Sequence, residues 1–278
     1  MEDVLQRAVS VIEQRLGLPM TGSLVRSGGS AIEIHPKEGH PNETFKLIWE
    51  YGFRTTSLKI VPGNFAAPMI KQMGLSFNEN WGYAKLFTEI LDARGSSIQF
   101  KVNGSILSIS DVQDVPQEWD SFELFCKSPL MVLNQNDLNQ INELVENFLL
   151  PAVGIIVSLV GLEEAYVESL GETEGNSYES ITRRYERKKV NREACIQLKG
   201  YACLVCGFDF KEAYGELGAD YVEVHHVVPV SKMGSNYRVN IESDLVPLCS
   251  NCHSMVHRKD PPLSVEELKA ALAGKPIE

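Results

Sequence analysis

The sequence predicts an α+β protein with two domains. Three observations lead to this prediction: apolar residues at helical spacing near the start, short apolar runs that alternate like strands, and two C-x2-C pairs near the end. A chain of 278 residues is long enough to bury two modest cores. We therefore expect a mixed N-terminal α+β domain over residues 1–170, a linker over 171–179 and a C-terminal domain over 180–278.

Helices and strands alternate within the first domain. An amphipathic pattern from Val4 to Leu16, stopped by Gly17, predicts the first helix. Alternating apolar residues at 45–49 and 98–102 predict half-buried strands, and Asn103-Gly104 predicts a hairpin turn because both residue types tolerate positive φ. Residues 66–73, 83–93 and 138–148 read as further helices, with Pro151 breaking the last one or opening a second.

The apolar stretch from Phe148 to Leu162 bears on localisation. It spans only 15 residues, whereas a membrane-crossing helix needs about 20, so a buried core helix is the favoured interpretation. The acidic start Met1-Glu2-Asp3 does not resemble a secretory signal. We expect a soluble, cytoplasmic protein with no membrane partner.

The charge distribution limits how the protein could meet nucleic acid. A net charge of −11 argues against unselective coating of DNA, which depends on neutralising phosphates. Beyond the polar, glycine-containing linker, however, a predicted helix ending at Gly200 begins with a basic run. This run is either a solvated helix face or a contact to the DNA backbone, and the candidate DNA-binding residues are Arg183, Arg184, Arg187, Lys188, Lys189 and, later in the chain, Arg258.

The cysteines predict a structural zinc site. Two C-x2-C pairs, Cys203/Cys206 and Cys249/Cys252, have the spacing at which thiolates share one tetrahedral Zn²⁺. The 42 residues between the pairs exceed the spacing of a simple zinc ribbon, so a substantial insert is expected there. Cys126 and Cys195 read as small buried apolar residues.

Four of the six histidines fall within 33 residues around the second pair. His225 and His226 follow an alternating run, so neighbouring side chains would point to opposite faces of a strand. His253 and His257, four residues apart, would share one face of a helix. Four independent surface histidines are the plainer alternative, and a metal site with an adjacent base is the one that this clustering favours.

Several segments together resemble the McrA-like branch of the HNH endonucleases. They are Gly200 to Phe210, Tyr214 to Gly218, Glu223-Val-His-His226, Asp244 to His253, His257-Arg258 and Pro261 to Leu268. The resemblance covers about 80 residues and leaves the first 170 unrecognised. It implies a ββα-metal fold, in which a two-stranded ribbon and a helix hold one divalent cation.

The resemblance also implies roles for individual residues. His225, His253 and His257 resemble ligands of a catalytic divalent metal such as Mg²⁺ or Mn²⁺, with His257 alternatively a phosphate contact. His226 resembles the general base. Asp244 stands where the family name has Asn and would pin the loop between ribbon and helix. From its position beside the histidines, Glu223 is either a partner that orients a histidine or an ordinary strand residue.

These features predict metal-dependent hydrolysis of DNA phosphodiester bonds. The resemblance further implies a restriction or defence nuclease whose N-terminal domain selects DNA, including modified DNA. The alternatives are a nickase or toxin of a mobile element and a non-catalytic zinc module that binds DNA or protein. Cutting both strands with one site per chain would suggest a homodimer.

Overall fold

The computed structural model describes residues 2–26, 30–37, 40–52, 54–107, 115–131, 137–160, 187–227, 239–259 and 262–274. The chain separates into two compact units, residues 1–190 and 191–278, and each is treated by itself below. The predicted linker at 171–179 lies outside the described residues. The domain limits drawn from the sequence therefore stay a prediction.

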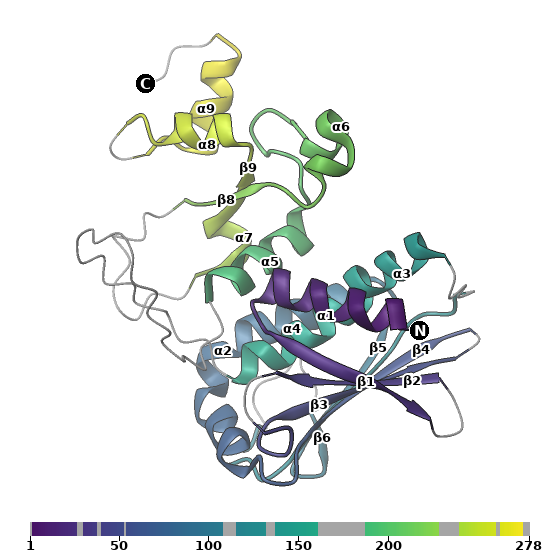
Figure 1. The fold of residues 1–278 in the computed structure, drawn as a ribbon. Helices are drawn as coiled ribbons and strands as arrows, with labels where there is room; N and C mark the ends of the chain where they lie inside the picture. Colours follow the sequence, from purple (N-terminus) through teal and green to yellow (C-terminus); the bar gives the residue numbers. More distant parts are fainter. Residues whose placement is uncertain are drawn as a thin grey trace, which may run out of the picture. The chain divides into compact units, whose positions relative to one another are not determined.

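The first unit contains a seven-stranded sheet in the order β1-β2-β3-β4-β7-β5-β6, with every neighbouring pair antiparallel (Figure 1). An antiparallel sheet can bury one face and leave the other to solvent. Its strands are β1 (Met20–Arg26), β2 (Ser30–Pro36), β3 (Phe45–Tyr51), β4 (Thr56–Pro62), β5 (Ser97–Val102), β6 (Ser105–Leu107) and β7 (Phe122–Lys127).

Strand alternation and the hairpin turn are both confirmed. Along β3, Phe45, Leu47 and Trp49 are fully buried while the residues between them are half-exposed. Val102 pairs with Ser105 across a two-residue turn, in which Asn103 and Gly104 have φ values of 51° and 80°. Two successive residues at positive φ are what a type I′ turn requires, so the Asn-Gly pair fixes the register of β5 and β6.

Helices lie on one face of this sheet (Figure 1). Helix α1 (Glu2–Leu16) ends where Gly17 adopts a φ of 70°, as its sequence predicts. The prediction of separate helices at 66–73 and 83–93 is wrong, because one helix, α2, runs from Ala67 to Ala93. Phe77 and Trp81, which lie between the two predicted segments, are buried four residues apart on one side of that helix. Their burial stabilises helical structure between the two segments.

The apolar stretch forms the core helix of the first unit. Helices α3 (Leu138–Leu144) and α4 (Leu150–Val160) are joined without a break by a π-helical turn at Val145–Leu149. Pro151 has no N–H to donate to the carbonyl of Asn147 one turn earlier; Arg94 Nη1 donates to that carbonyl instead, at 3.1 Å. Pro151 therefore neither breaks the helix nor opens a second one, and this prediction is corrected.

The continuous helix Leu138–Val160 is long and apolar enough to cross a membrane, judged by length and composition only. It is the one such helix in the described part of the chain. Within the protein, 78% of its most apolar window is buried, as in the core helices of soluble proteins. Helix α4 packs against both α1 and α2. The expected core helix is therefore observed, and the cytoplasmic location stays a prediction.

The second unit is small and follows the expected ribbon-and-helix order. Strands β8 (Glu223–His226) and β9 (Leu245–Leu248) pair antiparallel, and helix α8 (Ser250–Val256) follows at once. The last helix, α9, begins with the predicted capping box between Ser264 and Glu267. The other elements are α5 (Arg187–Lys199, residues 191–199 of which belong here), α6 (Phe210–Tyr214), η2 (Gly215–Gly218), α7 (Ile241–Asp244) and α9 (Val265–Leu272).

Two glycines in the helices of the first unit give opposite predictions. A Cβ at Gly154 would lie 2.8 Å from the ring of the fully buried Phe87, whereas a Cβ at Gly82 meets nothing within 4 Å. Gly82→Ala should raise the free energy of unfolding by about 0.5–1 kcal/mol through helix propensity. Gly154→Ala should lower it by about 1–3 kcal/mol, because overpacking outweighs that gain. Urea unfolding measures both, and equal stabilisation by the two would refute the packing described here.

Candidate metal centre

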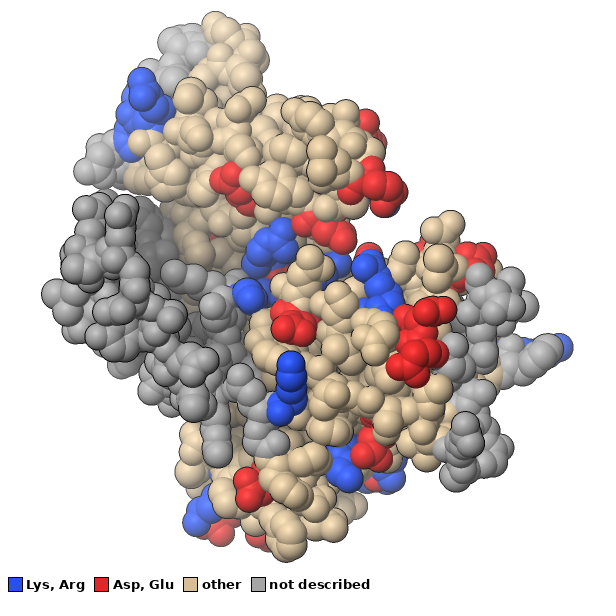
Figure 2. All heavy atoms as spheres, viewed as in Figure 1, with Lys and Arg blue, Asp and Glu red and all other residues tan. Residues whose placement is uncertain are grey.

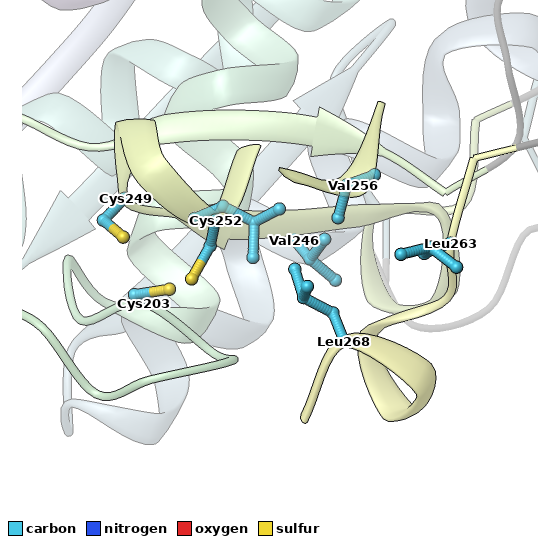
Figure 3. Packing of buried hydrophobic residues seen from close by; sticks show 8 residues of the cluster. Cys203, Val246, Cys249, Cys252, Val256, Leu263 and Leu268 are labelled. Atoms are coloured by element: carbon cyan, nitrogen blue, oxygen red, sulfur yellow. The ribbon is translucent and has the colours of Figure 1, made fainter. Parts of the chain in front are cut away.

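Four cysteine sulfurs converge in the second unit. Cys203 and Cys206 lie in the loop after α5, while Cys249 precedes α8 and Cys252 lies within it. All four Sγ atoms lie within 4.8 Å of one another, and Cys206 Sγ is 3.7 Å from Cys249 Sγ. A tetrahedron with Zn–S bonds of about 2.3 Å has edges of about 3.8 Å, so the four thiols fit a structural Zn²⁺. Figure 3 shows the sulfurs of Cys203, Cys249 and Cys252 turned toward one another.

The first cysteine pair lies in a tight turn that suits metal binding. Gly207 closes it at a φ of 74°, with its N–H donating to the carbonyl of Cys203. Burial alone would raise the pKa of Cys203, but backbone N–H groups of Cys206, Cys249 and Val205 donate to its sulfur and lower the pKa to about 7. A thiolate is the ligand form of cysteine, so the turn prepares this sulfur for a cation.

The other two cysteines behave as predicted from the sequence. Cys126 and Cys195 are fully buried, in the first and second unit respectively. Burial raises the pKa of Cys126 to about 12 and that of Cys195 to about 11. The positive charges of Lys199 and Arg192 partly oppose the rise at Cys195. Both thiols stay protonated at neutral pH and serve as small apolar residues.

Three histidines form a second cluster on the ribbon and the helix. His225 is buried on β8, His253 lies on α8, and His257 follows directly after α8. The three ring centroids are 4.9–5.2 Å apart, and one nitrogen from each ring lies within 4.8 Å of the others. Three imidazoles converging in this way fit one divalent cation with open coordination positions.

Electrostatics keep the first of these histidines neutral. Burial, together with the nearby imidazoles of His253, His257 and His226, lowers the pKa of His225 to about 4. A metal ion binds the unprotonated ring, so at neutral pH no proton competes for His225. His226, the next residue on β8, points to the opposite face of the strand and is half-exposed.

Glu223 lies against the histidine cluster. Its Oε2 is 2.5 Å from Nδ1 of His253, and its Oε1 accepts a hydrogen bond from Ser250 Oγ, also at 2.5 Å. The pKa of Glu223 is lowered, first by the Ser250 hydroxyl and then by His253. Of the two sequence interpretations, this contact favours orientation of a histidine over an ordinary strand residue.

Sequence reasoning missed Ser250 and Tyr221. The Tyr221 hydroxyl lies 3.3 Å from both Glu223 Oε1 and Ser250 Oγ. The spacing held a signal for each: Tyr221 is two residues before Glu223, on the same side of an extended chain, and Ser250 is one helical turn before His253.

Asp244 makes hydrogen bonds where the chain enters strand β9. It is 7% exposed, and its carboxylate accepts from the backbone N–H of Asn240 and from Ser243 Oγ, both at 2.7 Å. Its own carbonyl accepts from Val227 N–H at 2.8 Å and extends the ribbon by one pair. These bonds support the loop-pinning role inferred for it.

The structure describes only part of the set of candidate DNA-binding residues. Arg183 and Arg184 lie outside the described residues; of Arg187 and Lys188, at the start of α5, only the backbone is described. Lys189 is half-buried, with its aliphatic chain against Gly17, and Arg258 is exposed next to His257. On the face of the first unit drawn in Figure 2, basic and acidic side chains are interspersed.

Two basic side chains of α5 donate hydrogen bonds to backbone carbonyls of the ribbon and the residues beside it. Arg192 Nη2 donates to the carbonyls of Asp220 and Val222 at 3.1 and 3.2 Å, ahead of β8. Lys199 Nζ donates to the carbonyls of Glu242 and Leu245, both at 2.6 Å. Part of the positive charge on this helix therefore ties it to the strands that carry the site.

Zinc content tests the cysteine cluster. Cys252→Ser should lose the tightly held Zn²⁺ and destabilise the second unit, because three thiolates close the tetrahedral site poorly. Cys195→Ala, in the same unit, should keep its zinc and lose only the stability of a small buried side chain. Metal analysis after dialysis against a chelator reads this out, and equal zinc in both variants would contradict the assignment.

Asp244 offers a test of the loop-pinning bonds. Asp244→Ala removes the acceptor of Asn240 N–H and should cost about 1–3 kcal/mol, as for hydrogen bonds to a charged group. Asp244→Asn keeps one acceptor oxygen and should cost less. Hydrogen exchange of the amides at 240–248 reports the loss locally. Unchanged protection in the alanine variant would rule out the pinning role.

Comparison with known proteins agrees with this geometry. Residues 203–259 match the family model described as HNH endonuclease, a segment that holds both cysteine pairs, the ribbon and all four histidines. No curated protein and no solved structure gave a significant match to the chain. The α+β architecture with a four-cysteine cluster is as the sequence predicts. Residues 203–259 therefore form an HNH endonuclease domain, of the class of nucleases that act on DNA.

Proposed function

We propose that this protein is a metal-dependent DNA endonuclease that hydrolyses phosphodiester bonds through its HNH domain. The observation that carries the proposal is the convergence of His225, His253 and His257, with His226 adjacent on the same strand and facing away from His225. A structural zinc scaffold needs only the four cysteines, so the histidine cluster is the part that requires a chemical explanation.

The roles of the residues follow from their positions. His225, His253 and His257 hold the catalytic cation, with Glu223 orienting His253. A divalent cation bound there supplies Lewis-acid polarisation of the phosphate and stabilises the departing oxygen. His226 in its neutral form takes a proton from water, whose oxygen attacks phosphorus while the sugar oxygen leaves. Asp244 acts indirectly, by holding the loop between ribbon and helix.

The ligand atoms favour some metals over others. Mg²⁺ prefers oxygen ligands and keeps much of its water, whereas imidazole suits transition metals. A site of three neutral imidazoles therefore favours a transition metal such as Ni²⁺ or Zn²⁺ over Mg²⁺. Of the two cations predicted from the sequence, Mn²⁺ suits such a site better than Mg²⁺ does.

The first unit is proposed to select the DNA, in keeping with a restriction or defence nuclease of the McrA-like branch that recognises foreign or modified DNA. Of the aromatic residues that could stack on a base, Trp49, Trp81 and Phe87 are buried in the core and Tyr83 is half-buried, while Phe53 lies outside the described residues. Base recognition by this unit would therefore not use Trp49, Trp81 or Phe87. Arg258, exposed beside His257, is proposed as a phosphate contact.

The nickase or toxin and the non-catalytic zinc module differ in how well they fit the site. A mobile-element nickase or toxin would use the same metal site, and a single site per chain fits a nickase without further assumptions. Double-strand cutting would favour a homodimer, in which each chain cuts one strand. A non-catalytic zinc module is disfavoured by the three converging imidazoles and by the carboxylate that orients one of them.

A cleavage assay tests the proposal. Matched unmodified and modified DNA are incubated with Mn²⁺ or Mg²⁺, using the wild-type chain and His226→Ala. The wild type should cut with a requirement for metal, and the variant should be slower by about 10²–10⁴-fold because it lacks the base. Cutting of modified DNA alone would support selection by the first unit.

Two results would contradict the proposal. One is the absence of metal-dependent cutting on any DNA, single-stranded DNA included, which would favour the zinc-module alternative. The other is cutting at an unchanged rate by His226→Ala with its metal still bound, which would remove this residue from the chemistry.

A further inference from the structure

We propose that Tyr221 and Ser250 are positioning residues, whose hydroxyls lock Glu223 in the orientation that turns His253 toward the catalytic metal. This inference deepens the proposed function and rests on its metal site. It extends that site by two residues that make no contact with the cation themselves.

The chain of contacts runs from two hydroxyls through a carboxylate to an imidazole. Ser250 Oγ donates to Glu223 Oε1 at 2.5 Å, and the Tyr221 hydroxyl lies 3.3 Å from the same oxygen. The other oxygen of Glu223 faces Nδ1 of His253 at 2.5 Å. Both oxygens of the carboxylate are thus engaged, one by the hydroxyls and one by the ring.

This arrangement selects one tautomer of His253. An ionised carboxylate only accepts hydrogen bonds, so Nδ1 of His253 must carry the proton that it donates to Glu223. The lone pair then resides on Nε2, the nitrogen left for the cation. Fixing the carboxylate therefore fixes both the rotation of the ring and the nitrogen that faces the metal.

The hydroxyls are needed because the carboxylate and the imidazole are not deeply buried. The side chains of Glu223 and His253 are 33% and 28% exposed. A pair this open to water contributes little when each partner must give up its own rotamer freedom. The two hydroxyl contacts to Oε1 already restrict the rotamers of Glu223. Less rotamer entropy is then lost when Glu223 accepts the hydrogen bond from His253, so the pair holds the imidazole more firmly.

Each hydroxyl is itself held by a different part of the second unit. The Tyr221 ring packs edge-on against Phe210 at 4.6 Å between centroids, and Phe210 lies just after the first cysteine pair. Ser250 directly follows Cys249 and begins α8. The positioning network is therefore attached at both ends to the four-cysteine site.

Metal affinity of the full-length chain, with Zn²⁺ in the cysteine site, tests this inference. Mn²⁺ is titrated by electron paramagnetic resonance, since its hydrated free form gives a strong signal and it competes poorly for thiolates. Glu223→Gln should weaken Mn²⁺ binding by about 10–100-fold, as for other partners of metal ligands. The double variant Tyr221→Phe/Ser250→Ala should weaken it by about tenfold, each single variant by less.

Matched controls separate positioning from folding. Ser254→Ala removes an exposed hydroxyl from the same helix, and Tyr214→Phe removes one from the same aromatic cluster. Both should bind Mn²⁺ like the wild type. Ser250→Thr, which keeps the hydroxyl, should retain most of the Mn²⁺ affinity that Ser250→Ala loses. Zinc content, which reports that the second unit is folded, should stay unchanged in the double variant. In the zinc-only protein, ¹⁵N spectra of the imidazoles should show the Nδ1–H form of His253 in the wild type and a tautomer mixture in the double variant.

The outcomes distinguish the two proposals. Wild-type affinity in the double variant would overturn the positioning role, whatever the cleavage rate. Mn²⁺ binding at the histidines without cleavage of any DNA would overturn the proposed function, while the affinity ratio would still decide the positioning role. Failure of the wild type to bind Mn²⁺ at the histidines would overturn both.

Discussion

Helix α8 carries one member of each of two side-chain clusters that could hold a metal ion, although it is only seven residues long. Cys252 belongs to the thiol cluster, and the next residue, His253, belongs to the imidazole cluster. An isolated helix of this length does not persist in water. Its position therefore depends on the convergence of the four thiols and on the burial of Val256, which packs in one small core with Val246, Leu263 and Leu268 (Figure 3).

The ribbon supplies the second half of the same constraint. Because adjacent residues on a strand face opposite ways, one short strand presents His225 to the imidazole cluster and His226 to the other side. Arg192 and Lys199 hold the chain near β8 and β9 through backbone carbonyls, and Asp244 closes the open end. The proposed chemistry thus needs few residues, and the polar contacts of Arg192, Lys199 and Asp244 keep the strands that carry them in register.

Prediction from the sequence succeeded where local spacing decides the outcome. The two C-x2-C pairs, the His-His pair on a strand and the i, i+4 histidines specify their own geometry, so both clusters are found as expected. Prediction failed where tertiary contacts decide it. Helix α2 runs through Gly74 and Gly82, where Phe77 and Trp81 are buried. The helix from α3 to α4 continues past Pro151 through a π-helical turn, and Arg94 donates to the carbonyl of Asn147 that Pro151 leaves without a helix donor. The spacing of Ser250 and Tyr221 only hinted at a role, and their shared contact with Glu223 is established by the folded structure.

The most direct test of this account is anomalous diffraction from crystals of the full-length protein grown with Zn²⁺ and soaked in Mn²⁺. The account predicts a zinc peak among the sulfurs of Cys203, Cys206, Cys249 and Cys252, and a separate manganese peak within bonding distance of His225, His253 and His257. A single metal bridging cysteines and histidines would contradict it. So would manganese bound elsewhere while the three imidazoles stay empty.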